Sequence, residues 1–165
     1  MIFVWAAVVV LALFGLTVFF GAPYVPSLQT DLHDALAHVY TPTRGDVVID
    51  IGSGDGTVLR AVSQYGARAI GYEINPVLVL VTMLLSRKNK NVSVRWANIW
   101  RVTFPADTTV VYVFSESRDI QRIANKVQAE ARRLKRPLKL LSYGFSIPGK
   151  TAIKSSKSHH LYEFR

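Results

Sequence analysis

The chain has 165 residues and no cysteine, so it can form neither a disulfide framework nor a thiolate metal site. Half of the residues are hydrophobic, which suits one domain with a sizeable core, and the length is too short for two full domains. The 20 lysines and arginines against 11 acidic residues give a formal charge of +9, which favours a polyanionic neighbour, either nucleic acid or an anionic lipid surface.

The N-terminal stretch predicts a membrane span. Residues 2–22 carry no charge, and a helix of this length reaches about 30 Å, the thickness of a bilayer core. A cleaved signal peptide is the alternative, but nothing basic precedes the run, and Phe20 stands where a small residue is needed before a cut after Ala22. We favour a retained single-pass anchor. All 20 basic residues follow it, so the positive-inside tendency places the rest of the chain on the cytoplasmic side, or its organellar equivalent.

Alternating helices and strands are expected after the anchor. A proline-punctuated connector leads into a helix over 28–39, so residues 23–44 form a connector with an N-terminal helix, and residues 45–165 form the main domain. Strands separated by helical patterns predict an α/β fold, with a parallel sheet covered on both faces. The last segment, 149–165, predicts two short strands that pair antiparallel at the sheet edge. The expected strands are 47–51, 68–72, 92–96, 109–114 and 138–142, and the expected helices between them are 56–65, 76–87 and 118–135.

A glycine-rich loop follows the first expected strand. Asp50 lies near the end of that strand, and Gly52, Gly54 and Gly56 come at alternate positions before the next helix. Missing Cβ atoms let a ligand lie against the backbone at the end of a strand. A dinucleotide site would have the spacing G-x-G-x-x-G, whereas this chain has G-S-G-D-G, and Asp55 would place a negative charge beside a phosphate. A ligand with a cationic amino group and a sulfonium suits the two aspartates better.

A single acid closes the second expected strand. Glu73 stands 19 residues beyond Gly54, where its carboxylate can accept hydrogen bonds from both hydroxyls of a ribose. Because it lies at a strand end rather than in the core, we expect its replacement to leave the fold intact. Adenosine joined to an amino acid and a positive sulfur is S-adenosylmethionine, which is the predicted cofactor.

Five motifs in order and spacing carry a family resemblance: PYVPS, DIGSGDG, GYEINPVLV, NIWRVTF and VVYVF. They resemble the small membrane-anchored protein-lysine methyltransferases that modify the adenine nucleotide translocase and the c subunit of ATP synthase. The likeness covers residues 23 to about 148, and a single N-terminal span also fits that family. It implies the Rossmann-like seven-strand fold of S-adenosylmethionine-dependent methyltransferases, preceded by one transmembrane helix.

The resemblance also implies the residues that bind the cofactor. It assigns the ribose to Glu73, and the adenine to Asn98, Ile99 and Trp100, where Asn98 replaces the usual acid and loses its charge but keeps hydrogen-bonding capacity. The methionine end of the cofactor is assigned to Asp50, Gly52, Ser53, Gly54, Asp55 and Gly56. Further cofactor contacts are expected from Ile74, Asn75 and, in the connector, Tyr24.

The candidate catalytic residues are Ser115 and Glu116, which follow the fourth expected strand, where the methyl acceptor should arrive. Methyl transfer to a lysine amine is an in-line displacement in which proximity supplies most of the acceleration, so a strong base is optional. Glu116 could hold or deprotonate an incoming ammonium, or it could be a solvated loop acid. The loop has no Asn or Asp followed by Pro-Pro and an aromatic residue, which argues against methylation of amino groups in DNA bases or glutamine.

The expected function is thus methylation of a lysine in an integral membrane protein. An RNA methyltransferase and a non-catalytic, membrane-tethered cofactor-binding protein are the alternatives. Basic runs at 87–90 and 132–136 end two expected helices, where positive charge suits the helix dipole, and they could also contact anionic lipid headgroups. Nucleic acid is less favoured because basic patches interleaved with exposed aromatics are not evident. We expect no metal site, since His159 and His160 would point to opposite faces of a strand.

Overall fold

The computed structural model describes residues 1, 4–5, 29–114 and 117–165, and helices alternate with strands along them. Every element expected from the sequence after residue 28 is found, close to its expected bounds. The strands are β1 (Val47–Ile51), β2 (Arg68–Glu73), β3 (Val92–Trp96), β4 (Val110–Phe114), β5 (Leu138–Tyr143), β6 (Lys154–Ser156) and β7 (His159–Phe164). The helices are α2 (Gln29–His38), α3 (Thr57–Ser63), α4 (Pro76–Ser86), the 3-10 turn η1 (Ile99–Arg101) and α5 (Ser117–Leu134).

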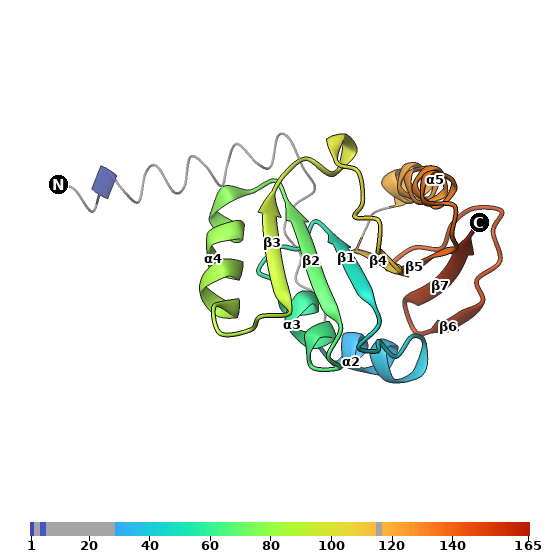
Figure 1. Cartoon of the computed structure of the whole chain (residues 1–165), viewed down its shortest axis with the longest axis horizontal. Coiled ribbons are helices and arrows are strands. Elements are labelled where there is room, and N and C mark those ends of the chain that lie inside the picture. Colours follow the sequence, from blue (N-terminus) through green and yellow to red (C-terminus); the bar gives the residue numbers. More distant parts are fainter. Residues whose placement is uncertain (2–3, 6–28, 115–116) are drawn as a thin grey trace.

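The strands form one seven-stranded sheet in the order β3-β2-β1-β4-β5-β7-β6 (Figure 1). The first five strands along this order run parallel, and β7 runs antiparallel to both of its neighbours. This confirms the predicted Rossmann-like α/β sheet and the antiparallel pair at its edge. The parallel strands all end at one edge of the sheet, so the residues that follow β1, β2 and β4 are brought together.

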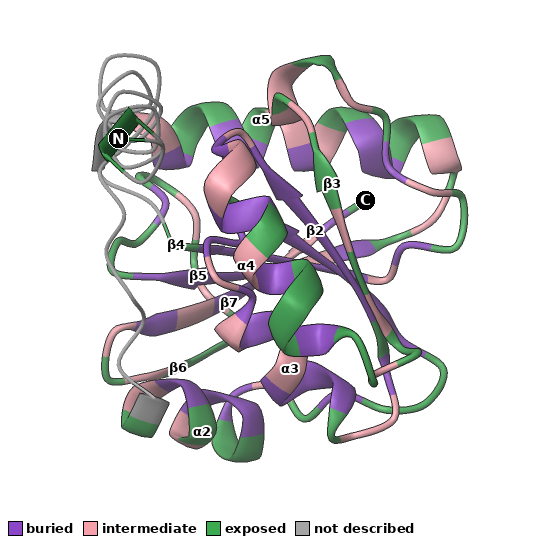
Figure 2. Ribbon diagram, turned by 90° about the vertical axis from the view of Figure 1, so that its left-hand side faces the viewer, coloured by how far each residue is buried: buried purple, intermediate pink, exposed green. Residues whose placement is uncertain are grey.

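Two apolar clusters cover the two faces of the sheet, and Figure 2 shows that the central strands between them are mostly buried. On one face, Leu36 of α2 and Leu59 of α3 pack against Val48, and all three are almost fully buried. On the other face, Ile120 and Val127 of α5 pack against the strands. Helix α4 lies over β3 and β2 at one end of the sheet. Between β3 and β4 the described chain forms only η1 and irregular backbone, so α5 is the α-helix on that face.

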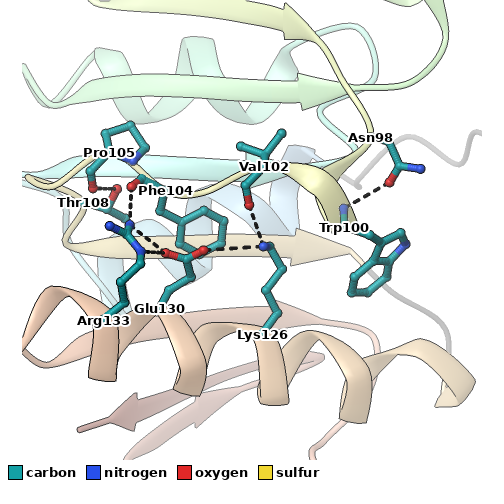
Figure 3. Close-up of polar contacts among 9 residues, drawn as sticks. All are labelled: Asn98, Trp100, Val102, Phe104, Pro105, Thr108, Lys126, Glu130 and Arg133. Atoms are coloured by element: carbon teal, nitrogen blue, oxygen red, sulfur yellow. Dashed lines mark hydrogen bonds and ion pairs between the residues drawn. The ribbon is translucent and has the colours of Figure 1, made fainter.

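The segment between η1 and β4 is held against α5 by ion-paired side chains (Figure 3). Lys126 Nζ donates to the carbonyl of Val102 at 2.6 Å, and Arg133 Nη2 donates to that of Phe104 at 2.6 Å. Glu130, which is 6% exposed, pairs with both cations, at 3.5 Å to Lys126 Nζ and 2.7 Å to Arg133 Nη2. One buried carboxylate therefore holds two cations that fix the backbone of this segment.

No helix among the residues that the structure describes has the length and apolar character to cross a bilayer. The predicted span over 2–22 lies outside those residues apart from 4–5, so it stays a prediction.

Candidate functional site

The glycine loop begins at the carboxyl edge of the sheet, directly after β1. Gly52 has a φ of 73°, in the left-handed region that favours glycine, and its N–H donates to the carbonyl of Tyr72 at 2.9 Å. A Cβ atom at Gly52 would meet no atom of the described chain within 4 Å. Open space therefore lies against the backbone at the point where the sequence predicts a ligand.

Three hydrogen bonds around Gly54 and Glu73 tie the loop to β2 and α4. The N–H of Gly54 donates to Glu73 Oε2 at 2.9 Å, and the N–H of Asn75 donates to Glu73 Oε1 at 2.8 Å. The hydroxyl of Thr82, in the middle of α4, donates to the carbonyl of Gly54 at 2.8 Å. Both side chains are buried, with Glu73 7% and Thr82 0% exposed. The loop is thus fixed from two sides.

These contacts correct the expectation for Glu73 and add Thr82 to the residues of the site. The expectation that Glu73 can be replaced without cost to the fold is wrong, because its buried carboxylate satisfies two backbone N–H groups. Each oxygen still has a lone pair with which to accept from a ribose hydroxyl. Thr82 was not expected at the site, although a hydroxyl in the middle of an apolar helix is a sequence signal for a buried hydrogen-bond partner.

Gly56 and Ser53 build the loop by packing. A Cβ atom at Gly56 would lie 2.5 Å from Thr82 Cγ2, so this glycine lets the loop approach α4 closely. The Ser53 side chain packs against β2, where a Cβ atom at Gly71 would lie 2.7 Å from Ser53 Cβ. The Ser53 carbonyl accepts from the N–H of Gly56 at 2.9 Å. Direct contact of these two residues with the cofactor stays a prediction.

Asp50 is a buried acid whose Oδ2 makes no hydrogen bond within the described residues. Burial, together with the charges of Glu73 and Asp55, raises the pKa of Asp50 to about 8. It stands on β1 at the same register as Tyr112 on β4, two residues before Gly52. A cation bound here would satisfy Oδ2 and favour the ionised carboxylate. A buried carboxylate oxygen of this kind suits the cationic methionine end of S-adenosylmethionine, and the contact itself stays a prediction.

Asp55 already has partners at the start of α3. Its carboxylate accepts from the N–H and the hydroxyl of Thr57, each at 3.0 Å, and lies 3.5 Å from Arg60 Nη2. Arg60 also donates to the Asp55 carbonyl at 2.6 Å. These bonds stabilise the first turn of the helix, and the predicted contact of Asp55 with the cofactor stays a prediction.

The residues assigned to adenine lie beyond β3, which pairs with β2 so that Trp96 stands beside Glu73. Asn98 accepts from the N–H of Trp100 at 3.0 Å and caps η1 (Figure 3). Its amide nitrogen makes no hydrogen bond to any described residue in the structure, so it can donate to a base. Trp100 and Ile99 pack half-buried on the core.

The neighbouring contacts keep these residues in place. The guanidinium of Arg122 on α5 lies 3.8 Å from the ring centre of Trp100. Asn75 caps α4 by accepting from the N–H of Val77 at 2.9 Å, and the carbonyl of Ile74 accepts from Trp96 Nε1 at 2.9 Å. The structure thus brings the predicted ribose and adenine residues to one edge of the sheet.

An aromatic group lies at the carboxyl ends of β4 and β5. Phe114, Tyr143 and His159 stand at matching register on β4, β5 and β7. The ring centroid of Tyr143 lies 4.7 Å from the ring centroid of Phe114. On its other neighbour, the Tyr143 ring stacks on His159 with 4.4 Å between the two ring centroids. Phe114 is 38% exposed, whereas Tyr143 and His159 are buried. The group therefore presents Phe114 at the edge where the acceptor is expected.

His159 is held neutral beneath this group. Burial lowers the pKa of His159 to about 4, and its Nε2 lies 3.2 Å from the hydroxyl of Tyr112. His160, next to it, lies on the opposite side of β7 and contacts Ser155 at 2.9 Å, as expected for a strand.

Three predicted site residues lie outside the described residues: Tyr24, Ser115 and Glu116. Their roles stay predictions. Within the described part of the chain, no three or more histidine, aspartate or glutamate side chains gather as a metal site would require.

The sequence model of the ANTKMT methyltransferase domain matches residues 50–154, more than half of the chain. The chain belongs to this family. The match begins at Asp50 and includes the glycine loop and Glu73, together with Phe114 and Tyr143 of the aromatic group. It confirms the predicted S-adenosylmethionine-dependent methyltransferase domain.

Curated relatives agree with this assignment. The lysine N-methyltransferase of the ATP synthase c subunit from Xenopus laevis is 32% identical over 111 residues, which cover 66% of this chain and 48% of that protein. The adenine nucleotide translocase lysine N-methyltransferase of Mus musculus is 32% identical over 112 residues, which cover 66% of this chain and 48% of that protein. The chain spans about half the length of the curated relatives it matches.

The fold is also found in solved structures. An RNA methyltransferase from Salinibacter ruber, in complex with S-adenosyl-L-homocysteine, aligns with a TM-score of 0.73 over 85% of this chain and 92% of that one. At 20% sequence identity, this likeness shows the fold and does not identify the acceptor.

Proposed function

We propose that this protein is an S-adenosylmethionine-dependent protein-lysine N-methyltransferase that acts on an integral membrane protein. The observation that carries the cofactor assignment is the buried Oδ2 of Asp50, which has no hydrogen-bond partner among the described residues and lies two residues before Gly52, where the backbone borders open space. The acceptor assignment is supported by the two relatives, whose names give lysine as the methylated residue. One of them is named for the adenine nucleotide translocase and the other for the c subunit of ATP synthase.

The chain's own residues can orient the reaction. S-adenosylmethionine, when bound, supplies a methyl group whose carbon–sulfur bond breaks as its bond to the lysine nitrogen forms, with the electron pair left on sulfur. Asp50 would hold the amino group of the cofactor, Glu73 the ribose and Asn98 the adenine. Holding the methyl donor and acceptor in line supplies most of the acceleration.

The acceptor has to arrive as a neutral amine. Phe114 offers an exposed aromatic face to the lysine stem and its ammonium at the end of β4. We assign Glu116, two residues further on, as the group that accepts the ammonium proton, and Ser115 as its neighbour in positioning the amine.

The membrane part of the proposal rests on the uncharged run over 2–22. As a single-pass anchor, it would hold the domain on the cytoplasmic side or its organellar equivalent. Only about six residues separate Ala22 from Leu28, which at about 3.3 Å each lets the domain stray about 20 Å from the bilayer. An anchored enzyme and an anchored substrate then share one surface, which raises their effective concentration.

The test is methyl transfer by the full chain. The purified protein is incubated with radiolabelled S-adenosylmethionine and separated membrane, ribosome and RNA fractions, and labelled peptides are sequenced by mass spectrometry. We expect label on a lysine of a membrane protein, and its loss with Asp50→Asn. Label confined to RNA would establish the RNA methyltransferase alternative, and cofactor binding without transfer to any fraction would indicate a non-catalytic binding protein.

A further inference from the structure

Helix α4 is apolar on every side. Its sequence, PVLVLVTMLLS, contains no charged residue. One side, which includes Leu78, Val79 and Thr82, is buried against the sheet. The side chains on the opposite face are 55–63% exposed and are Leu80, Met83, Leu84 and Leu85. We call this outer face the α4 face. A helix that is hydrophobic all round is normally buried, so the exposed α4 face is expected to bind another apolar surface.

The surroundings of the α4 face are basic. From Ile74 to Ala106 the chain has no acidic residue and five basic ones: Arg87, Lys88, Lys90, Arg95 and Arg101. Trp96, on the edge strand β3 that α4 covers, is 70% exposed and has its Nε1 bonded to the carbonyl of Ile74. A tryptophan with an exposed ring and a satisfied N–H is typical of the boundary between water and an apolar phase.

An open groove of about 460 Å³ continues from the α4 face at Leu85. Apart from Leu85, the groove is lined by basic side chains and side-chain amides, which belong to Arg60, Gln64, Lys88, Asn89, Lys90 and Asn91. Arg60 is paired with Asp55, whereas Lys88 and Lys90 are exposed and have no ion pair with any described residue. Apolar side chains thus lie next to two uncompensated ammonium groups. Figure 2 looks onto this end of the molecule, with α4 towards the viewer.

We propose that the α4 face docks on a bilayer that contains anionic phospholipid. Leu80, Leu84 and Leu85 would enter the boundary between headgroups and acyl chains, and Lys88 and Lys90 would contact lipid phosphates. This combination of an apolar face with flanking cations matches a lipid surface in both polarity and charge. A twofold pairing of two copies through the same face would instead bring their basic clusters together, which is unfavourable.

This inference goes beyond the proposed function. It concerns a surface outside the cofactor site, and it depends neither on the identity of the acceptor nor on the segment 2–22. It assigns an orientation: the β3 end of the sheet faces the membrane.

The test uses the full chain and its lack of cysteine. Leu84→Cys is labelled with a polarity-sensitive fluorophore, and Ala129→Cys, on the exposed side of α5, carries the same label as the matched control. Both are mixed with vesicles of phosphatidylcholine, with or without phosphatidylglycerol. We expect the Leu84 label to shift to the blue and to be quenched by lipid-borne quenchers on anionic vesicles, while the Ala129 label stays in water. Because a tether alone leaves both labels in water, equal spectra at the two positions would overturn the proposal.

Three further outcomes would identify another binding partner of the α4 face, and each would also overturn the proposal. A blue shift without lipid that grows with protein concentration would mean a second copy of the chain. A blue shift without lipid that is independent of concentration would mean a segment of the same chain. A shift produced by single-stranded RNA and not by vesicles would mean a nucleic-acid surface.

Charge removal tests the role of the cations. In the labelled Leu84→Cys background, Lys88→Gln and Lys90→Gln should each weaken the lipid-induced response about fivefold, and added salt should weaken it further. Lys135→Gln, at the end of α5, is the control and should change nothing. A response that is unchanged by all of these substitutions and by salt would contradict the anionic-lipid assignment.

Discussion

Glu73 accepts a hydrogen bond from the backbone N–H of Gly54, with 2.9 Å between Oε2 and N. This contact joins the end of β2 to the loop after β1 across 19 residues of sequence. The carboxylate assigned to the ribose therefore also determines where the loop backbone lies, so binding and folding are coupled at one side chain.

Replacing Glu73 by glutamine should weaken both properties. Gln can accept from only one of the two N–H groups and turns its own NH₂ towards the other, which costs about 1–3 kcal/mol of folding free energy. We expect a lower free energy of unfolding in denaturant titrations and weaker binding of S-adenosylmethionine by calorimetry. Glu163→Gln, a half-buried acid on β7, is the control. Unchanged affinity for the cofactor would remove Glu73 from the ribose site.

Alanine at Gly52 and at Gly56 should have different effects. Both backbones have positive φ, so each substitution costs about 1–2 kcal/mol of strain. Only at Gly56 does the new Cβ collide with Thr82 Cγ2, at 2.5 Å, which adds to the loss of stability. At Gly52 the new Cβ enters open space, so the main loss should be cofactor affinity. Thermal unfolding and calorimetry on both variants would separate the effects, and equal stability losses would contradict this division.

Cofactor binding should depend on pH through Asp50. Its pKa near 8 means that the free protein holds a proton there at neutral pH, whereas a bound cation favours the ionised form. Binding should thus release a proton below pH 8, and affinity should rise as the pH rises towards 8 and level off above it. Calorimetry in buffers of different ionisation enthalpy measures this release. Asp50→Asn should abolish it, and proton release that persists in this variant would come from another group.

Acid stability should depend on His159. The unfolded chain takes up a proton at this side chain near pH 6.5, but the folded protein does so only near pH 4. Stability from this group is therefore lost as the pH falls from about 6.5 to about 4. His159→Phe should flatten the pH dependence of the free energy of unfolding in that range. An unchanged pH dependence in His159→Phe would show that the neutral buried histidine is misassigned.

Phe114→Ala tests the acceptor side. We expect a KM for the protein acceptor raised several-fold, because the exposed ring no longer contacts the lysine, with little change in affinity for S-adenosylmethionine. Phe145→Ala, at another exposed aromatic, is the control. If both variants methylate the acceptor like the unaltered chain, the amine approaches elsewhere.

Local patterns were sufficient to predict the order of elements and the position of the loop. The alternation of apolar runs with helical spacing predicts β1 to β5, and the glycines after Asp50 predict a backbone turn at a strand end. These features depend on residues close in sequence.

The different roles of similar residues within the site could not be predicted in the same way. Gly52 and Gly56 look alike in sequence, and only the position of Thr82, 26 residues beyond Gly56, shows that one borders open space and the other packs on α4. His159 likewise joins Tyr143 through antiparallel pairing of β5 with β7, which no local pattern specifies. Contacts of this kind depend on the tertiary arrangement.

The buried Glu130 has a consequence for local unfolding. Glu130 pairs with Lys126 and Arg133, which donate hydrogen bonds to the carbonyls of Val102 and Phe104. The segment between η1 and β4 is therefore bound to α5, a helix that comes later in the chain. Amide hydrogens around η1 should then exchange with solvent at the rate at which α5 opens, rather than at the rate of the neighbouring edge strand. The residues assigned to adenine and α5 would form one cooperative unit.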